Sequence, residues 1–194
     1  MVPTIAVIPV KSFSGGKLRL SSVIDDAGRL ALGRALAAHV ADIAASCDLV
    51  PLIVTSDSEV ATWATTSGFP SLADSGDGLD AAAADGAAWA QEARSHWLIV
   101  HADLPLLTRD DLVAVSSVDG DVIAPSSDGG TSVLGASQSI EFGYGPESFH
   151  RHLPRLNSPT VVARLGLLHD VDSPSDLESA LHHPLGSWLG EYLS

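Results

Sequence analysis

The sequence predicts a single α/β domain over residues 1–194, with a mostly parallel (mixed) central sheet that carries helices on both faces in a Rossmann-like arrangement. Two observations lead to this fold class. Short runs rich in β-branched residues alternate with longer stretches in which apolar residues recur at helical spacing. The chain of 194 residues can bury a substantial core, and it shows no internal repeat or linker that would mark a second domain.

The predicted strands and helices follow one another along the chain. Strands are expected at residues 4–10, 49–55, 97–101, 122–125 and 131–135. Helices are expected at residues 27–47, 59–67, 79–93, 108–115 and 173–183, with a further helix beginning within 145–148. The helix starts carry capping residues, namely Asp25 or Asp26, Thr108, and Ser173 with proline after it. A turn is predicted at 74–78, and the tail beyond 183 has no clear pattern.

The composition excludes several classes of protein. The formal net charge is -14, so most of the surface would repel nucleic acid and anionic membranes. No apolar run approaches the roughly 20 residues that cross a bilayer, and the N-terminus lacks the basic region and cleavage site of a secretory signal. We therefore expect a cytoplasmic protein without nucleic-acid or membrane partners. The single Cys47 permits no internal disulfide and no structural zinc site, and we expect it to be buried on a helix.

Positive charge is concentrated in residues 11–19, which we call the anion loop. The only two lysines of the chain, Lys11 and Lys17, lie in it, and Arg19 lies beside them. The loop follows a strand, and its backbone N–H groups can turn toward a phosphate at Ser14, Gly15 and Gly16. Together these features predict a site for an anion such as a triphosphate. The alternative is a solvated surface loop whose charges are incidental.

The anion loop differs from a Walker A loop at two positions. Lys11 stands where that motif has its first glycine, and Leu18 stands where a serine or threonine would hold magnesium. Because Lys17 belongs to a polar loop, we expect it to be exposed and to contribute little to stability.

Three aspartates are candidate Mg²⁺ ligands. Asp103 ends a predicted strand just before a Leu-Pro pair, and the carboxyl end of a strand is where ligands gather in such sheets. Asp170 and Asp172 alternate along an extended segment, which places both carboxylates on one side of it. Mg²⁺ takes few protein carboxylates and completes its octahedron with water and phosphate oxygens. The alternatives are that Asp103 is a loop or capping residue, that Asp172 caps the next helix, and that Asp170 is solvated.

Further along the chain, two segments offer hydroxyl groups beside glycines. Gly145 and Ser148 flank the start of the predicted helix, whose N-terminus suits a phosphate or carboxylate, and Thr131 follows a Gly-Gly pair. His150 and His152 are spaced by two residues, so a helix would not place them on one face as a metal pair. We expect them on the surface or in supporting roles, with His152 a candidate for contact with an acceptor group. We expect His101 to be structural.

Taken in order, five segments make the chain resemble the 2-phospho-L-lactate and phosphoenolpyruvate guanylyltransferases. They are residues 8–20, Asp103-Leu104-Pro105, the Gly-Gly-Thr turn at 129–131, Phe142 to Ser148, and residues 170–177. That family makes the activated intermediate in coenzyme F-420 biosynthesis. The resemblance spans nearly the whole chain, and it implies the nucleotidyltransferase fold of the molybdopterin guanylyltransferase type.

Carried over residue by residue, the resemblance implies a division of labour. Lys11, Lys17 and Arg19 would hold the triphosphate of GTP, with Asp103, Asp170 and Asp172 binding Mg²⁺ and Thr131, Gly145 and Ser148 holding the phosphoacid. Lys17, Arg19 and Asp103 would then be the catalytic residues, and Asp80 would add a contact to the nucleotide. Two positions depart from the family, which often has threonine in place of Leu18 and asparagine in place of Asp80.

The reaction implied by the resemblance is in-line attack by the acceptor phosphate on the α-phosphorus of GTP, with pyrophosphate released and no general base required. The acceptor stays open among 2-phospho-L-lactate, phosphoenolpyruvate and 3-phosphoglycerate, and so does the oligomeric state, a homodimer included. Two other readings remain. One is a nucleotidyltransferase for a sugar phosphate or molybdopterin, for which the compact chain lacks an obvious insertion. The other is a non-catalytic GTP-binding domain, which would rarely need three separated aspartates.

Overall fold

The computed structural model describes residues 2–76 and 78–193. Asp77, in the predicted turn, lies outside the described residues. Within them, the strands form one seven-stranded sheet in the order β3-β2-β1-β4-β6-β5-β7. Their bounds are β1 Thr4–Pro9, β2 Val50–Val54, β3 Ser71–Leu72, β4 His96–Val100, β5 Val122–Pro125, β6 Thr131–Gly135 and β7 Thr160–Val161. β6 runs antiparallel to both of its neighbours, and every other strand pair is parallel, which confirms the mixed sheet.

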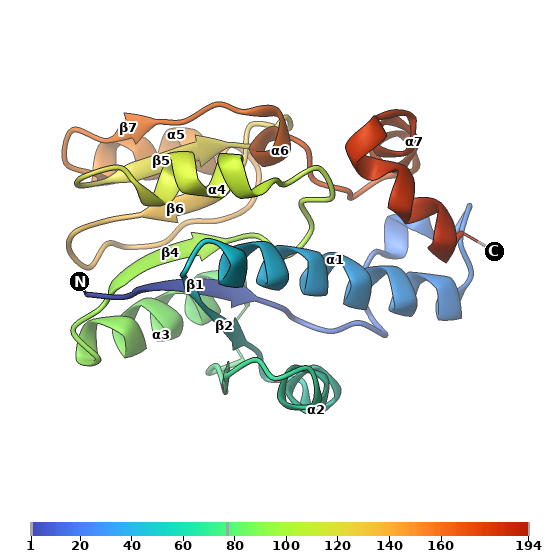
Figure 1. Ribbon diagram of the computed structural model, residues 1–194, viewed down its shortest axis with the longest axis horizontal. Coiled ribbons are helices and arrows are strands. Elements are labelled where there is room, and N and C mark those ends of the chain that lie inside the picture. The colour runs from blue at the N-terminus through green and yellow to red at the C-terminus, as the bar shows by residue number, and fades with distance from the viewer. Residues whose placement is uncertain (1, 77, 194) are drawn as a thin grey trace.

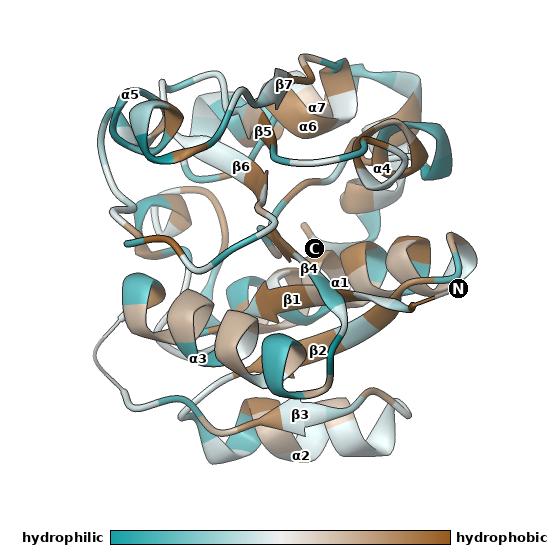
Figure 2. Ribbon diagram, turned by 90° about the vertical axis from the view of Figure 1, so that its left-hand side faces the viewer, coloured by the Kyte–Doolittle hydropathy of each residue, from teal (hydrophilic) through white to brown (hydrophobic). Residues whose placement is uncertain are grey.

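Helices cover both faces of this sheet (Figure 1). The α-helices are α1 Asp26–Ser46, α2 Ser58–Thr66, α3 Leu79–Glu92, α4 Arg109–Ser116, α5 Ser148–His152, α6 Leu165–Leu168 and α7 Pro174–His182. The 3₁₀ helices are η1 Leu18–Leu20, η2 Leu153–Arg155 and η3 Pro184–Tyr192. Figure 2 shows α3 and α5 on one side of the sheet and α1 and α4 on the other. None of the described helices is long and apolar enough to span a membrane.

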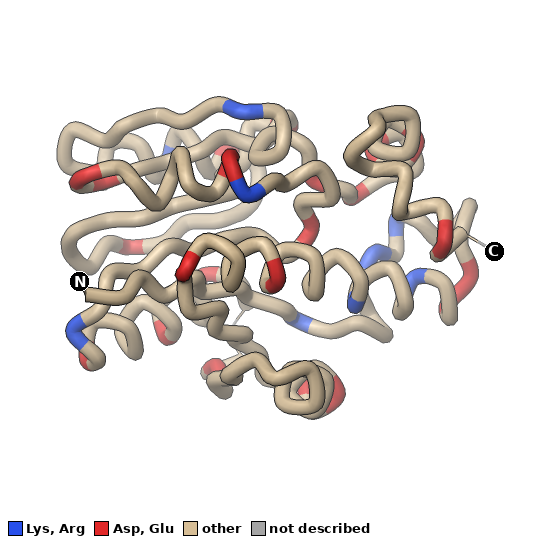
Figure 3. Tube along the Cα trace, in the orientation of Figure 1, with Lys and Arg blue, Asp and Glu red and all other residues tan. Residues whose placement is uncertain are grey.

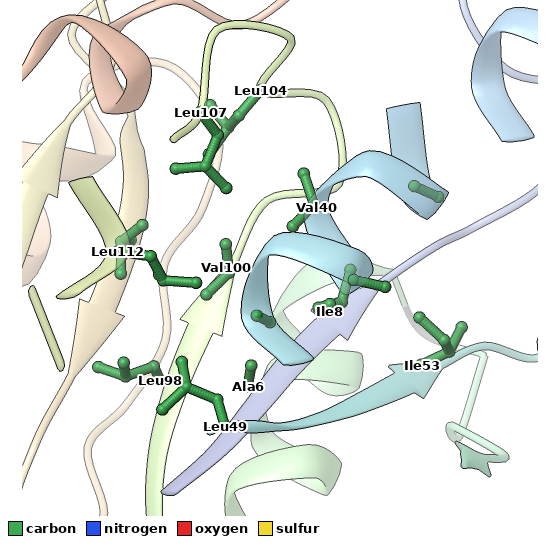
Figure 4. Close-up of a cluster of buried hydrophobic side chains, with 14 of the residues drawn as sticks. Ala6, Ile8, Val40, Leu49, Ile53, Leu98, Val100, Leu104, Leu107 and Leu112 are labelled. Carbon is green, nitrogen blue, oxygen red and sulfur yellow. The ribbon is translucent and has the colours of Figure 1, made fainter. Parts of the chain in front are cut away.

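The core lies on both faces of the central strands, as the period-two alternation of a strand dictates. In β1, Ala6 and Ile8 join the cluster beneath α1 and α4, whereas Ile5 and Val7 join the cluster beneath α3. Figure 4 shows Ala6 and Ile8 in the same cluster as Val40 of α1. On the opposite face, α3 approaches β1 closely because Gly86 has no side chain, and a Cβ there would collide with Val7. Packed helices therefore cover both faces of the sheet. The remaining place for a ligand is the edge beyond the ends of the strands.

A third apolar cluster lies beyond the sheet, where α7 and η3 pack on the first half of α1. It includes Leu20 of η1, Val171 and Leu189, all essentially buried. In Figure 1 these elements project past the ends of β1 and β4. The cluster therefore anchors the anion loop and the segment that carries Asp170 and Asp172. The tail that showed no sequence pattern thus folds as η3 and forms part of this support.

The predicted helix caps are present. Asp25, not Asp26, caps α1 and accepts from the Gly28 N–H, while Thr108 and Ser173 form capping boxes at α4 and α7. Cys47 is half-buried at the end of α1 and not fully enclosed. The predicted helix at 145–148 begins at Ser148 and has only five residues.

Candidate active site

A cavity of about 370 Å³ opens where β1 and β4 end, between α1 and α3. Its size is ordinary for a small-molecule site. Six of its lining residues are apolar, and we call them the apolar wall: Val10, Phe13, Leu36, Val54, Leu79 and Ala82. Its lining also includes the polar residues Lys11, Lys17, His101, Asp103 and Asp172. The cavity can thus hold a molecule that has both an apolar face and anionic groups.

Lysines and arginines gather around this end of the sheet, although the chain as a whole is acidic. Five of the ten, from Lys11 to Arg34, lie between the end of β1 and the middle of α1. Figure 3 shows these blue segments grouped where the chain passes from β1 into α1. A local positive potential in an acidic protein concentrates anionic ligands at that place.

Lys17 joins the anion loop to two of the predicted metal ligands. Its Nζ lies 2.6 Å from Oδ2 of Asp103 and 2.9 Å from Oδ1 of Asp172. The backbone at Lys17 is left-handed, with φ 53°, and turns the chain into η1. Burial opposes the charge on Lys17, but the Asp103 and Asp172 carboxylates outweigh it and raise the pKa of the lysine. The ammonium is therefore a permanent cation at the cavity wall.

Negative charge around Asp103 exceeds what Lys17 neutralises. The Oδ1 atom of Asp103 is buried and has no hydrogen-bond partner among the described residues. Burial would raise the pKa of Asp103, but the Lys17 ammonium outweighs it and holds that pKa below the ordinary value. At Asp170, burial together with the nearby Asp103 carboxylate raises the pKa to about 6. A further cation at this point would relieve both the unpaired oxygen and the crowded carboxyls.

The donor set fits Mg²⁺, which needs only one or two carboxylates besides water and phosphate oxygens. In the described part of the chain, no three His, Cys, Asp or Glu side chains form a ready metal cage. Asp103 and Asp172 are brought together by Lys17, and Val171 donates its N–H to the Asp103 carbonyl, which holds the segment of Asp170 beside them. Asp170 and Asp172 flank the buried Val171, as alternation along an extended segment predicts.

The predicted nucleotide-binding residues divide into two groups. Lys11, Gly16 and Lys17 line the cavity. Ser14, Gly15 and Arg19 are exposed nearby, outside the residues that line it. Asp80 is also exposed, and its carboxylate accepts the N–H of Tyr144 at 2.6 Å. The structure thus ties Asp80 to the segment around Gly145.

The three predicted acceptor-binding residues lie together, outside the cavity lining. Thr131 and Ser148 are each 1% exposed, and the Ser148 hydroxyl donates to the Thr131 hydroxyl at 3.3 Å. Gly145 has φ 106°, a conformation that favours glycine, and its carbonyl accepts the Ser148 N–H. Their role in binding an acceptor stays a prediction.

The histidines behave differently from one another. His150 is exposed, as expected. His152 is completely buried, which rules out a surface position for it and leaves the supporting role that was the other expectation. The five-residue helix α5 packs one side against the sheet. This packing, and not the spacing of the two histidines in the sequence, buries His152. His101 lines the cavity, and its Nε2 is buried without a partner among the described residues. Burial lowers the pKa of His101, so the ring is neutral.

Sequence reasoning missed the apolar wall of the cavity. Phe13 was the available signal, because it is the one aromatic residue in an otherwise polar loop. It is 2% exposed and meets the Trp63 ring edge to face at 5.2 Å. Gly33 of α1 faces Phe13, where a Cβ would sit 3.4 Å from its ring. A contact between a small residue on one element and a large residue on another produces no periodic pattern in the sequence, so it could not be predicted from it.

Comparison with known proteins gives a consistent result. The family described as "Guanylyl transferase CofC like" matches residues 4–194. The phosphoenolpyruvate guanylyltransferase of Sphaerobacter thermophilus is 35% identical, over 95% of this chain and 96% of its own. That of Rubrobacter xylanophilus is 34% identical over 89% and 90%. The 2-phospho-L-lactate guanylyltransferase of Methanothermobacter thermautotrophicus is 29% identical over 98% and 89%.

Solved structures agree on the fold. A Desulfovibrio desulfuricans structure described as a nucleotide-diphospho-sugar transferase superposes with a TM-score of 0.73 at 18% identity, covering 98% of this chain and 95% of that one. A CMP:2-keto-3-deoxy-manno-octonic acid synthetase complexed with CTP gives a TM-score of 0.56 at 11% identity, over 98% of this chain and 100% of that one. At these identities the likeness concerns the fold alone. The match over residues 4–194 and the relatives above 30% identity show that the chain belongs to the CofC-like guanylyl transferase family.

Proposed function

We propose that this protein transfers GMP from GTP to the phosphate of a small phosphorylated carboxylic acid, with release of pyrophosphate, as a step in coenzyme F-420 biosynthesis. The single observation that carries the proposal is the position of Lys17, whose ammonium is held by Asp103 and Asp172 at the wall of the cavity beyond β1 and β4. Family membership supports the reaction class. This geometry supports a site at which a divalent cation on these carboxylates, together with the lysines of the anion loop, would neutralise a polyanion.

The chemistry follows from the groups at the cavity. An oxygen of the acceptor phosphate attacks the α-phosphorus of GTP and forms a new P–O bond, while the bond to the β-phosphate oxygen breaks. The attacking phosphate is already ionised at neutral pH, so no protein base is needed and the neutral His101 is not required as one. Lys11 neutralises part of the charge of the triphosphate, and Lys17, which is shared with Asp103 and Asp172, helps to orient it, which reduces repulsion between two anions.

A divalent cation completes the proposal. Asp103, with Asp170 and Asp172, would hold Mg²⁺, which when bound supplies further neutralisation of charge at the α-phosphate and the leaving pyrophosphate. The unpaired Oδ1 of Asp103 supports this assignment. The apolar wall supports a place for the nucleobase, because Leu79 is 37% exposed there and offers surface to a planar ring.

The names of the relatives give two candidate acceptors, phosphoenolpyruvate and 2-phospho-L-lactate. A third candidate of the same class of small phosphorylated acids is 3-phosphoglycerate. All three carry one phosphate and one carboxylate. In phosphoenolpyruvate and 2-phospho-L-lactate both groups are attached to the same carbon, whereas in 3-phosphoglycerate they are attached to neighbouring carbons. We propose that one of these acids is the acceptor, and that GTP is preferred over ATP.

Pyrophosphate release tests the function directly. Purified protein with Mg²⁺ is given GTP, ATP or CTP together with each acid in turn, and controls omit the acid, the nucleotide or the metal. We expect release only with both substrates and Mg²⁺, fastest with GTP. An undiminished rate in EDTA would refute the metal assignment. GTP binding without release for any acid would favour the non-catalytic reading.

A further inference from the structure

His152 is a buried polar side chain to which the proposed reaction assigns no role. It is 0% exposed and contacts Thr131, one of the three predicted acceptor-binding residues. Its Nδ1 is 3.0 Å from the Thr131 hydroxyl, and its Nε2 accepts the Gly143 N–H at 2.9 Å. The ring therefore connects β6, which begins at Thr131, with the segment 143–146 that carries Gly145.

The hydrogen bond from Gly143 fixes the tautomer of His152. A backbone N–H can only donate, so Nε2 must be the unprotonated nitrogen of a neutral ring. Burial and the neighbouring Arg155 lower the pKa of His152 to about 4, so the ring is neutral at physiological pH. The proton therefore sits on Nδ1, which donates to the Thr131 hydroxyl oxygen.

The orientation of the Thr131 hydroxyl follows. A hydroxyl oxygen has two lone pairs. At Thr131 one accepts from His152 Nδ1, and the other accepts from the Ser148 hydroxyl. The hydroxyl proton of Thr131 can then only donate, and no acceptor for it is present among the described residues. The network thus leaves one directed donor, which suits an anion and would not suit a cation or a second donor.

The surroundings favour the same chemistry. Arg151 donates to the carbonyls of Gly143, Tyr144 and Pro146 and so holds the segment 143–146 in place. This adds positive charge beside the network. The Tyr144 ring lies 4.8 Å from His152 and 5.2 Å from His101, which lines the cavity. The network therefore lies one side chain behind the cavity wall.

We infer that His152 is a positioning residue for the phosphoacid, which acts by committing the Thr131 hydroxyl to donate to this anion. The inference rests on the proposed function, since it assigns the anion to the acceptor. It does not make His152 a catalytic residue, because the ring touches protein groups only.

Kinetics with phosphoenolpyruvate and GTP test the inference. His152→Phe keeps a ring and removes both polar atoms, so KM for phosphoenolpyruvate should rise about tenfold or more while KM for GTP stays within about twofold. His152→Gln keeps a donor and an acceptor and should recover most of the loss. His150→Phe, on the exposed side of α5, is the matched control and should change neither constant. Melting temperatures are measured for every variant.

A double-mutant cycle separates positioning through Thr131 from a general structural role. Thr131→Val should raise KM for phosphoenolpyruvate by a similar factor. His152→Phe added to Thr131→Val should then cause less than about a further twofold rise, because no hydroxyl remains to be oriented. Equal losses for GTP and phosphoenolpyruvate, or full multiplication of the two effects, would overturn the inference.

The tautomer can be tested without turnover, so the inference and the proposed function can fail separately. ¹⁵N NMR of the His152 ring should show a protonated Nδ1 and an unprotonated Nε2 at pH 7. A protonated Nε2 would overturn the inference even in an active enzyme. If the tautomer is as stated but no acid yields pyrophosphate, calorimetry can compare the affinity of wild type and of His152→Phe for phosphoenolpyruvate. The inference predicts weaker binding to the variant. Equal affinity for both would overturn it.

Discussion

Lys17 and Asp103 form an ion pair between residues 86 positions apart in the sequence, with Nζ 2.6 Å from Oδ2. The Lys17 side chain is 13% exposed and that of Asp103 is 22% exposed. The expectation that Lys17 is an exposed loop lysine is therefore wrong, and its small contribution to stability, which was inferred from exposure, no longer follows. The pair fixes the anion loop to the end of β4, and removal of one partner leaves the other charge largely out of water.

Lys17→Met should destabilise the protein, because it retains the length of the side chain but leaves Asp103 and Asp172 without their cation. We expect a loss of roughly 1 to 3 kcal/mol, which lowers the melting temperature by several degrees in a chain of this size. Lys11→Met is the matched control, since Lys11 is exposed, and its melting temperature should stay near that of wild type. Added Mg²⁺ should restore part of the loss at Lys17. A Lys17→Met protein as stable as the control would contradict the structural role of the pair.

Asp103→Asn should abolish most of the turnover without unfolding the chain. Asparagine keeps the size of the side chain but removes the charge that pairs with Lys17 and, in our proposal, holds Mg²⁺. Neutralisation by a metal is worth several kcal/mol in the transition state and about 1.4 kcal/mol is tenfold in rate, so we expect a loss of orders of magnitude. Asp110→Asn, on the exposed start of α4, is the control. A wild-type rate with a wild-type Mg²⁺ requirement would show that Asp103 is only a loop residue.

Much of the fold could be predicted from the sequence because its main elements are long and periodic. The short apolar, β-branched run of β1 and the capping residues Thr108 and Ser173 are local signals, and the structure contains the strand and both capped helix starts. β3 and β7 have two residues each, too few to show any period. The antiparallel position of β6 between β4 and β5 depends on packing between distant segments, which no local pattern records.

The candidate site could be predicted only in part, because local sequence signals place single residues but not the contacts between distant segments. Asp103 could be placed because the carboxyl ends of parallel strands meet at one edge, and it lies there. Its pairing with Lys17 could not be predicted, because it is a contact between distant loops. The burial of His152 was missed because a helix of five residues gives no reliable apolar face.

The stability of the protein should depend on pH through His152. Burial lowers the pKa of His152 to about 4, below the value of 6.5 for a free imidazole. Between these values the unfolded chain binds a proton that the folded chain does not, so stability falls as pH falls, by at most about 1.4 kcal/mol per pH unit. His152→Gln should lack this component and lose less stability between pH 6.5 and 4.5 than wild type. Urea unfolding at several pH values measures the difference, and parallel curves for the two proteins would contradict the buried neutral ring.

For Asp80, the sequence-based prediction and the structure suggest different contacts. The resemblance implies a contact with the nucleotide, whereas the structure shows the Asp80 carboxylate accepting the Tyr144 N–H at 2.6 Å, next to Gly145. Asp80→Ala should therefore raise KM for the phosphoacid, by roughly threefold to tenfold, and leave KM for GTP nearly unchanged, because the segment 143–146 loses its tie to α3. Asp80→Asn, which restores the residue often found in the family, keeps an acceptor oxygen for this bond and should behave like wild type. A rise in KM for GTP alone would show instead that Asp80 contacts the nucleotide.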